Sequence, residues 1–226
     1  MEGTEDRVRD GSLRVGVIDG VAPWVTWNAG DPRGVESQLV RELAERLGAD
    51  VQWVKGSDTE LFGALAAFEL DLVIGGIERS SPWGKEVALT RPYHETRMML
   101  GWPDGQRATQ ELSGQRVEVE PNTALARKLK KRGAVPVALV EQRGERLPIA
   151  AAEWQIEAWG MQASPPVLDT QKRVFALPPG ENRWLQTVQR FLFGKREGVP
   201  AMLRAELSAA VSTLPADLAL PGVERR

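Results

Sequence analysis

The chain has 226 residues, enough for one large domain or two smaller lobes. Its hydrophobic content of 42% and charged content of 27% are typical of a soluble globular protein, and its net charge of -2, with no basic stripe, argues against a nucleic-acid partner. The absence of cysteine excludes disulfides, thiolate catalysis and cysteine-based zinc sites. No apolar run approaches the roughly 20 residues that cross a bilayer. Because the first residues show no secretory signal pattern, the protein is either cytoplasmic or begins after a removed leader.

The first elements follow an alternation of strand and helix. Residues 1–11 are polar, and we expect them to be loosely held. The apolar run 13–17 predicts a strand, and a turn at 28–34 leads into a helix that ends at Gly48. Residues 51–54 predict the second strand.

The next segment places a glycine pair at the end of a buried strand. Ser57 and Glu60 form a predicted capping box before an amphipathic helix. The continuous apolar run 72–74 is typical of a strand covered on both faces, and it ends at the glycine pair 75–76. Because ligands gather at the carboxyl ends of strands in open α/β sheets, we expect ligand contacts directly after this pair. The β-α-β-α-β order predicts a parallel sheet.

A second unit begins near Trp102, and the chain later returns to the first. The elements predicted for the second unit are a strand at 116–120, a basic helix capped by Asn122 or Thr123, an edge strand at 135–140 that contains Pro136, an apolar run at 147–151 and a helix ending near Gly160. A strand at 173–177 and two helices, at 184–193 and 201–209, complete the prediction.

Two connections, near residues 97–101 and 170–176, link the units. Two crossings allow hinge closure of two lobes around a small molecule. The predicted division is the first lobe at 1–98, a shortened second lobe at 99–172, a return to the first lobe at 173–210 and a tail at 211–226.

Several segments together resemble the family 3 extracellular solute-binding proteins, the binding components of polar amino-acid ABC importers. The matching segments are 13–17, the loop of Pro23 and Trp24, 34–54, 69–77, 85–93 and 173–192. The resemblance implies an α/β, two-lobed periplasmic-binding-protein-like fold of type II, each lobe a mostly parallel sheet flanked by helices. It also implies a small-molecule solute as ligand, an ABC transporter permease as partner and a periplasmic or extracytoplasmic location. We expect a monomer without cofactor or metal.

The resemblance also assigns ligand contacts to the loop after the glycine pair, beginning at Gly76. In amino-acid binders of this family a hydroxyl residue and an arginine there hold the ligand's α-carboxylate, but here Glu78 and Trp83 occupy these positions. One interpretation is that Glu78 faces a cationic ligand group and Trp83 forms an aromatic wall. The other is that Glu78 pairs with Arg79 or another arginine. Arg79 or Arg97 could still bind an anion from a different angle.

Further candidates each have a structural alternative. Trp24 contacts ligand or packs beneath its loop, and Asp19 contacts ligand or caps the local turn. Asn122 and Thr123 bind a polar ligand group or form an ordinary helix cap. Glu153 lies where the family often has an aspartate that receives the ligand's amino group.

The leading functional hypothesis is a non-enzymatic solute-binding protein whose ligand is cationic or aromatic. His94 is the only histidine, and no nucleophile, phosphate-loop or dinucleotide motif accompanies it. One alternative is a dehydratase-like enzyme on the same scaffold, with Glu78 or Glu153 as general acid. Others are a sensor module and a docking module that binds a bulky apolar molecule or a protein.

Overall fold

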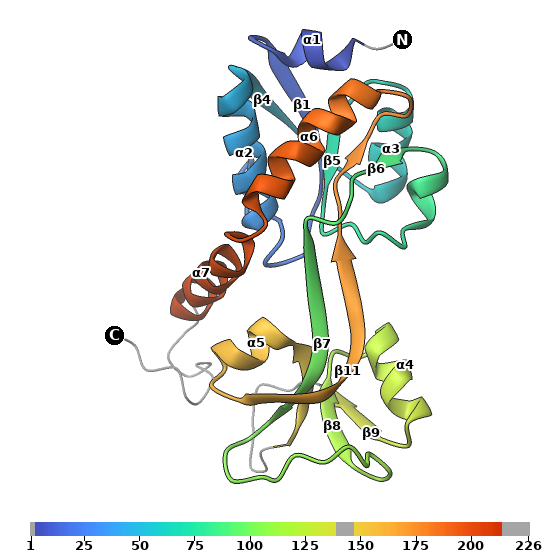
Figure 1. Cartoon of the computed structure of the whole chain (residues 1–226), viewed down its shortest axis with the longest axis vertical. Helices are drawn as coiled ribbons and strands as arrows, with labels where there is room; N and C mark the ends of the chain where they lie inside the picture. The colour runs from blue at the N-terminus through green and yellow to red at the C-terminus, as the bar shows by residue number, and fades with distance from the viewer. Residues whose placement is uncertain (1–2, 139–146, 214–226) are drawn as a thin grey trace. The chain divides into compact units, whose positions relative to one another are not determined.

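The computed structural model describes residues 3–138 and 147–213, which form two compact units (Figure 1). Unit 1 comprises the residues up to Glu95 together with Lys172–Glu206. Unit 2 comprises Thr96–Gln171 and the described residues from Leu207 on. The chain therefore leaves unit 1 after Glu95, returns to it at Lys172 and leaves it again after Glu206.

Unit 1 is built on a mixed five-stranded sheet. Its elements are α1 (Thr4–Val8), β1 (Ser12–Ile18), β2 (Thr26–Asn28), β3 (Asp31–Arg33), α2 (Val35–Leu47), β4 (Asp50–Gly56), α3 (Asp58–Ala66), β5 (Leu72–Ile74), the 3₁₀ helix η1 (Pro82–Lys85), β6 (Ala88–Leu89), β12 (Ala176–Leu177) and α6 (Asn182–Lys195), followed by α7 (Val199–Thr213). The strand order is β4-β1-β5-β12-β6. β1 pairs in parallel with β4 and β5, but β12 runs antiparallel to β5 and β6. The parallel arrangement predicted for the strands at 13–17, 51–54 and 72–74 is therefore confirmed, and the added strands β12 and β6 make the sheet mixed.

Helices α2 and α3 of unit 1 form where the sequence predicts them. α2 buries an apolar face that includes Leu39 and Leu43, and it ends at Gly48 in the left-handed conformation at φ 66°. Ser57 and Glu60 form the predicted capping box: the Ser57 hydroxyl accepts from the Glu60 amide, and the Glu60 carboxylate accepts from the Ser57 amide. α3 packs with β5 and β12 in one apolar cluster, and α2 lies on the opposite side of the sheet (Figure 1).

Unit 2 has its own sheet and core. Its elements are β7 (His94–Trp102), β8 (Arg116–Val119), α4 (Ala124–Lys131), β9 (Val135–Ala138), β10 (Ile149–Ala152), α5 (Glu153–Ala158) and β11 (Gln162–Arg173). The strand order β11-β7-β10-β8-β9 confirms that the Pro136 strand lies at an edge, where a residue without an amide donor is tolerated. Leu100, Val117 and Leu129 belong to the buried core. This sheet is also mixed, since β10 pairs antiparallel with β7 and parallel with β8.

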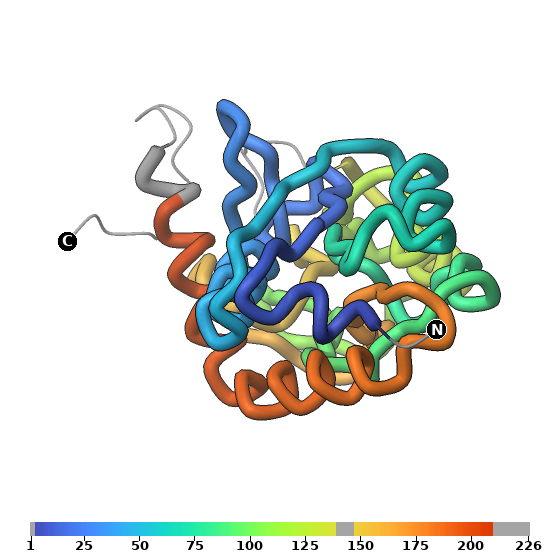
Figure 2. The backbone as a smooth tube through the Cα atoms, turned by 90° about the horizontal axis from the view of Figure 1, so that it is seen from above, coloured from blue at the N-terminus to red at the C-terminus, as the bar shows by residue number. Residues whose placement is uncertain are grey.

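The prediction of loosely held residues 1–11 is wrong. Part of this segment forms α1, which lies beside α6 (Figure 2). The amide of Thr4 donates to the Glu181 carboxylate at 3.2 Å, and the Thr187 hydroxyl donates to the buried Glu5 carboxylate at 3.0 Å. Polar residues are ordered here because their partners come from the far end of the chain.

Two further segments differ from their predictions. The predicted turn at 28–34 is part of a hairpin, in which Thr26–Asn28 pairs with Asp31–Arg33. The predicted strand at 173–177 is divided, since β11 ends at Arg173 and β12 begins at Ala176. Residues 139–140 of the predicted edge strand, and the predicted tail from residue 214, lie outside the described residues.

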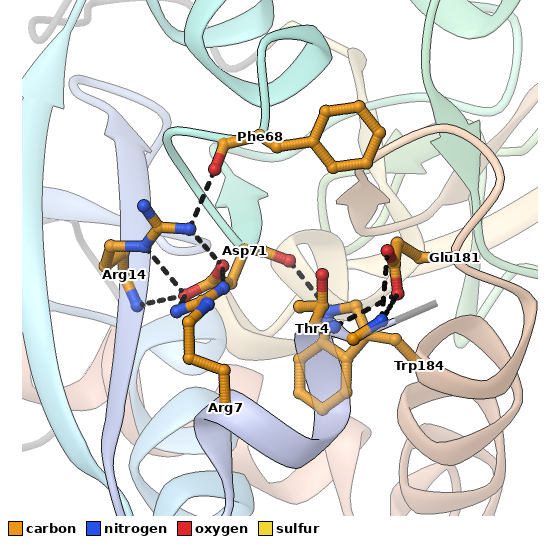
Figure 3. Close-up of polar contacts among 8 residues, drawn as sticks. Thr4, Arg7, Arg14, Phe68, Asp71, Glu181 and Trp184 are labelled. Atoms are coloured by element: carbon orange, nitrogen blue, oxygen red, sulfur yellow. Dashed lines mark hydrogen bonds and ion pairs between the residues drawn. The ribbon is translucent and has the colours of Figure 1, made fainter. Parts of the chain in front are cut away.

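Asp71, immediately before β5, connects three segments of unit 1 (Figure 3). Its fully buried carboxylate accepts from the Arg14 amide at 2.9 Å and from the Arg14 guanidinium at 2.8 Å, and it also pairs with Arg7. Its backbone carbonyl accepts from the indole N–H of Trp184 at 2.8 Å. The start of β5 is thereby tied to α1, β1 and α6.

Candidate functional site

The glycine pair that ends β5 is required by packing in unit 1. Gly75 and Gly76 have φ values of 153° and 62°, a range that residues with a side chain rarely adopt. A Cβ on Gly75 would lie 2.4 Å from Ile18, and one on Gly76 would lie 2.5 Å from Val21. The space that the sequence suggested for a ligand at Gly76 therefore holds the side chain of Val21.

A buried carboxylate, Glu36 at the start of α2, holds this pair in place. Its Oε2 accepts from the amides of Gly75 and Gly76 at 2.8 and 2.9 Å, and its Oε1 accepts from the Tyr93 hydroxyl at 2.6 Å. Burial raises the pKa of Glu36, although these three hydrogen bonds act in the opposite direction. Burial and the neighbouring Glu36 also raise the pKa of Tyr93 well above its ordinary value, so its hydroxyl remains a donor.

The pKa of Glu36 makes the stability of unit 1 depend on pH. A carboxyl whose pKa is raised by folding stabilises the native state below its unfolded value, near 4.5, and this contribution is lost as the pH rises through the folded pKa. We therefore expect the wild type to lose stability relative to Glu36→Gln as the pH rises from about 4.5 towards neutrality. Urea unfolding of both proteins across this range measures the difference, and parallel pH profiles would contradict it.

Arg173, at the end of β11, fills the space beside the glycine pair. Its guanidinium donates to the carbonyl oxygen of Gly76 and lies 5.2 Å from the ring centroid of Trp24. Its Nη1 also forms an ion pair with the Glu78 carboxylate at 3.8 Å, so the alternative that Glu78 pairs with another arginine describes its surroundings in this structure. One face of the Trp24 ring is therefore occupied by a cation of the chain itself.

Trp24 belongs to a buried aromatic group. Its ring centroid is 6.1 Å from that of Tyr93, which in turn lies 5.2 Å from Phe175. The Trp24 side chain is only 3% exposed, so the packing alternative describes its surroundings in this structure.

Glu78 and Arg79 lie on the surface that follows the glycine pair. The Glu78 side chain is 41% exposed, and its carboxylate accepts a long hydrogen bond of 3.4 Å from the Ser80 hydroxyl. Arg79 donates its amide to the carbonyl of Lys172 at 2.8 Å, while its side chain is exposed. Both side chains can therefore meet a solute.

Trp83 and Asp19 have partners within unit 1. The Trp83 ring stacks on Phe62 at 5.0 Å with an interplanar angle of 8°, at the edge of the cluster beneath α3. Asp19 accepts from the amide of Trp27 and from the ammonium of Lys55, both at 2.7 Å, and these two bonds, the Lys55 bond first, lower its pKa. Its contacts match the turn-capping alternative.

The candidates of unit 2 also have partners within that unit. Thr123 caps α4, where its hydroxyl accepts from the Ala126 amide at 3.2 Å, and the exposed Asn122 precedes it at a φ of 62°. Glu153 accepts from the Arg97 side chain at 2.7 Å. Within residues 3–138 and 147–213, no group of three or more histidine, cysteine, aspartate or glutamate side chains could hold a metal ion.

Sequence reasoning missed Glu36 and Arg173, the two charged residues that hold the loop. Both left a signal in the sequence. Glu36 shares the apolar face of α2 with Val40 and Leu43 at helical spacing, and Arg173 directly precedes a fully buried run at 174–177. A charge inside an apolar pattern indicates a buried, hydrogen-bonded group.

None of the helices that the structure describes is both long and apolar enough to cross a membrane. Among curated proteins, the chain is similar to a probable histidine-binding protein of Campylobacter jejuni, 22% identical over 115 residues. That match covers 50% of this chain and 45% of the relative, so the chain is matched to about half of the relative's length.

Solved structures share the two-lobed fold. One is the L-cystine solute receptor of Neisseria gonorrhoeae in its unliganded open conformation, with a TM-score of 0.69 at 16% identity, covering 89% of this chain and 94% of that one. An ancestral cationic amino acid solute-binding protein gives a TM-score of 0.70 at 18% identity, covering 91% and 99%. A binding component from Wolinella succinogenes complexed with lysine gives 0.61 at 18% identity, covering 85% and 94%.

The model of the bacterial extracellular solute-binding proteins, family 3, matches residues 13–217. This match spans the elements of unit 1 and unit 2 alike, including the loop with the glycine pair. The fold is the α/β, two-lobed type II architecture that the sequence predicts, with mixed rather than mostly parallel sheets. The chain belongs to family 3 of the bacterial extracellular solute-binding proteins.

Proposed function

We propose that the chain binds a small cationic solute, of the kind of a basic amino acid, at the loop that follows β5 and delivers it to an ABC importer. The observation that carries this proposal is the carboxylate of Glu78, which is 41% exposed and makes a long ion pair of 3.8 Å with Arg173. Arg173 also contacts the Gly76 carbonyl and the Trp24 ring, so an incoming ammonium or guanidinium group can share the exposed Glu78 carboxylate with it.

The residue at position 83 supports the same class of ligand. An arginine there would offer a forked pair of donors to the ligand's carboxylate, but Trp83 stacks on Phe62 instead. A solute that is recognised chiefly through a cationic group does not require that fork. The exposed Arg79 is the proposed contact for any carboxylate that such a solute carries.

The relatives favour a basic amino acid among cationic solutes. The probable histidine-binding protein, the ancestral cationic amino acid binder and the lysine complex are each named for a ligand with a basic side chain or for that class. Their identities to this chain are only 18–22%, too low to assign a ligand, so the proposed ligand class rests on Glu78.

The remaining candidates follow from this proposal. Asp19 is a proposed ligand contact of unit 1, and the buried Trp24 supports this surface through its contact with Arg173. Asn122, Thr123 and Glu153 are proposed ligand contacts of unit 2. We propose a non-enzymatic, monomeric protein outside the cytoplasm, with a membrane permease as its partner. Ligand recovered chemically unchanged after incubation supports binding over the dehydratase alternative, and a converted product would contradict it.

Calorimetric titration with lysine, arginine, histidine and putrescine tests the ligand class, with leucine and glutamate for comparison. We expect the basic ligands to bind and Glu78→Gln to weaken them at least tenfold, about 1.4 kcal/mol. Glu86→Gln, an exposed carboxylate of the same loop, is the matched control. The proposal would be overturned if neutral amino acids bound with an affinity that Glu78→Gln does not change. It would also be overturned if none of these ligands bound.

A further inference from the structure

A cavity of unit 1 is lined by the C-terminal half of α6 and by residues 91–93, which follow β6. Its volume is about 230 Å³, and it is lined chiefly by Arg91, Pro92, Arg190, Leu192, Phe193 and Arg196; Tyr93 and Gln189 complete the lining. All of them belong to unit 1. Drug-sized ligands occupy pockets of about 300 Å³ or more, so this cavity suits a smaller molecule.

The cavity is positively charged, and no acidic residue lines it. Arg196 donates to the carbonyl oxygen of Pro92, which fixes one guanidinium at the rim. The side chains of Arg91 and Arg190 are exposed and form no ion pair within residues 3–138 and 147–213. The chain as a whole has a net charge of -2, so this concentration of unpaired arginines is local.

An exposed aromatic ring adjoins the arginines. Phe193 is 68% exposed, and the guanidinium of Arg196 lies 4.9 Å from its ring centroid. Leu192 and Pro92 add further apolar surface to the cavity. Apolar lining residues beside cationic donors are complementary to a molecule that carries an oxyanion at one end and an apolar body at the other.

We infer that this cavity binds a small organic anion, with a carboxylate or phosphate group joined to a body about the size of a phenyl ring. Arginine offers two parallel N–H donors to a planar carboxylate or to a phosphate, which makes Arg91 and Arg190 the ligands of the anionic group. Phe193 and Leu192 contact the apolar body. The inference does not depend on the proposed solute or on Glu78.

The probes for this site are phenyl phosphate, benzoate and inorganic phosphate, titrated into the full chain and followed by calorimetry and NMR. We expect phenyl phosphate and benzoate to bind with dissociation constants in the millimolar range or tighter, and inorganic phosphate to bind several-fold more weakly. Arg190→Gln and Arg91→Gln should each weaken the binding of phenyl phosphate about tenfold. Phe193→Ala should weaken the binding of phenyl phosphate and leave the affinity for inorganic phosphate unchanged.

Arg33→Gln is the matched control, since it removes the same charge from an exposed arginine of unit 1 that does not line the cavity. The inference is overturned if the organic anions do not bind at millimolar concentration. It is also overturned if Arg33→Gln weakens them as much as Arg190→Gln does, or if inorganic phosphate binds as tightly as phenyl phosphate. Loss of basic-solute binding in Glu78→Gln with intact phenyl phosphate binding would separate the two sites.

Discussion

Replacing Glu36 by alanine should lower the free energy of unfolding by about 4 kcal/mol, because three buried donors lose their acceptor and each costs roughly 1–3 kcal/mol. The donors are the amides of Gly75 and Gly76 and the hydroxyl of Tyr93, all within 2.9 Å of the carboxylate. Urea denaturation of the purified protein measures the loss. The same variant should release the loop that carries Glu78, so weaker solute binding should accompany it.

Two further variants show whether the loss comes from the hydrogen bonds. Glu36→Gln keeps one oxygen for the two amides and an amide group for Tyr93, and it should cost much less than Glu36→Ala. Glu45→Ala, at an exposed position of the same helix, should change stability by less than about 0.5 kcal/mol. A loss below 1 kcal/mol in Glu36→Ala would show that the loop does not depend on this carboxylate.

Replacing Asp71 by alanine should cost about 3 kcal/mol, since its buried carboxylate accepts charge-assisted hydrogen bonds worth roughly 1.5–3 kcal/mol each. The estimate stays near one such bond because Arg7 and Arg14 are 44% and 29% exposed and regain water when the carboxylate is removed. Thermal or urea unfolding measures the loss. The bond from Trp184 to the Asp71 carbonyl persists in this variant, so the measurement isolates the side chain.

Asp71→Asn provides the comparison, because it retains one acceptor oxygen for the Arg14 amide but removes the charge and replaces the other oxygen with an NH2 donor. We expect its stability to lie between those of the wild type and Asp71→Ala. Glu86→Ala, an exposed and distant carboxylate, should have little effect. If Asp71→Ala were as stable as Glu86→Ala, the ion pairs drawn in Figure 3 would contribute nothing measurable.

The sequence predicts the elements whose signals are local. α2 follows from its apolar periodicity and Gly48, and α3 follows from the capping box of Ser57 and Glu60. The edge position of the Pro136 strand follows from the missing amide donor. In each case the residues that determine the element lie within a few positions of one another.

The parts that sequence reasoning missed depend on distant partners. Glu5 is buried because Thr187 and Arg183 meet it from α6, about 180 positions away, and nothing near it in the chain indicates this. Arg173 likewise reaches Gly76 across 97 positions. The sequence identified the glycine pair at the end of β5. The reason for it, the close packing of Ile18 and Val21, became visible only in the folded structure.

The discontinuity of unit 1 has a consequence for synthesis of the chain. β12 lies between β5 and β6, and α6 provides the partners of α1, so the first sheet lacks its inner strand until residues 176–195 have been made. Most of unit 2 is continuous in sequence and emerges from the ribosome earlier. We therefore expect unit 2 to fold first, while the nascent unit 1 exposes the unpaired edge of β5, where a chaperone can bind.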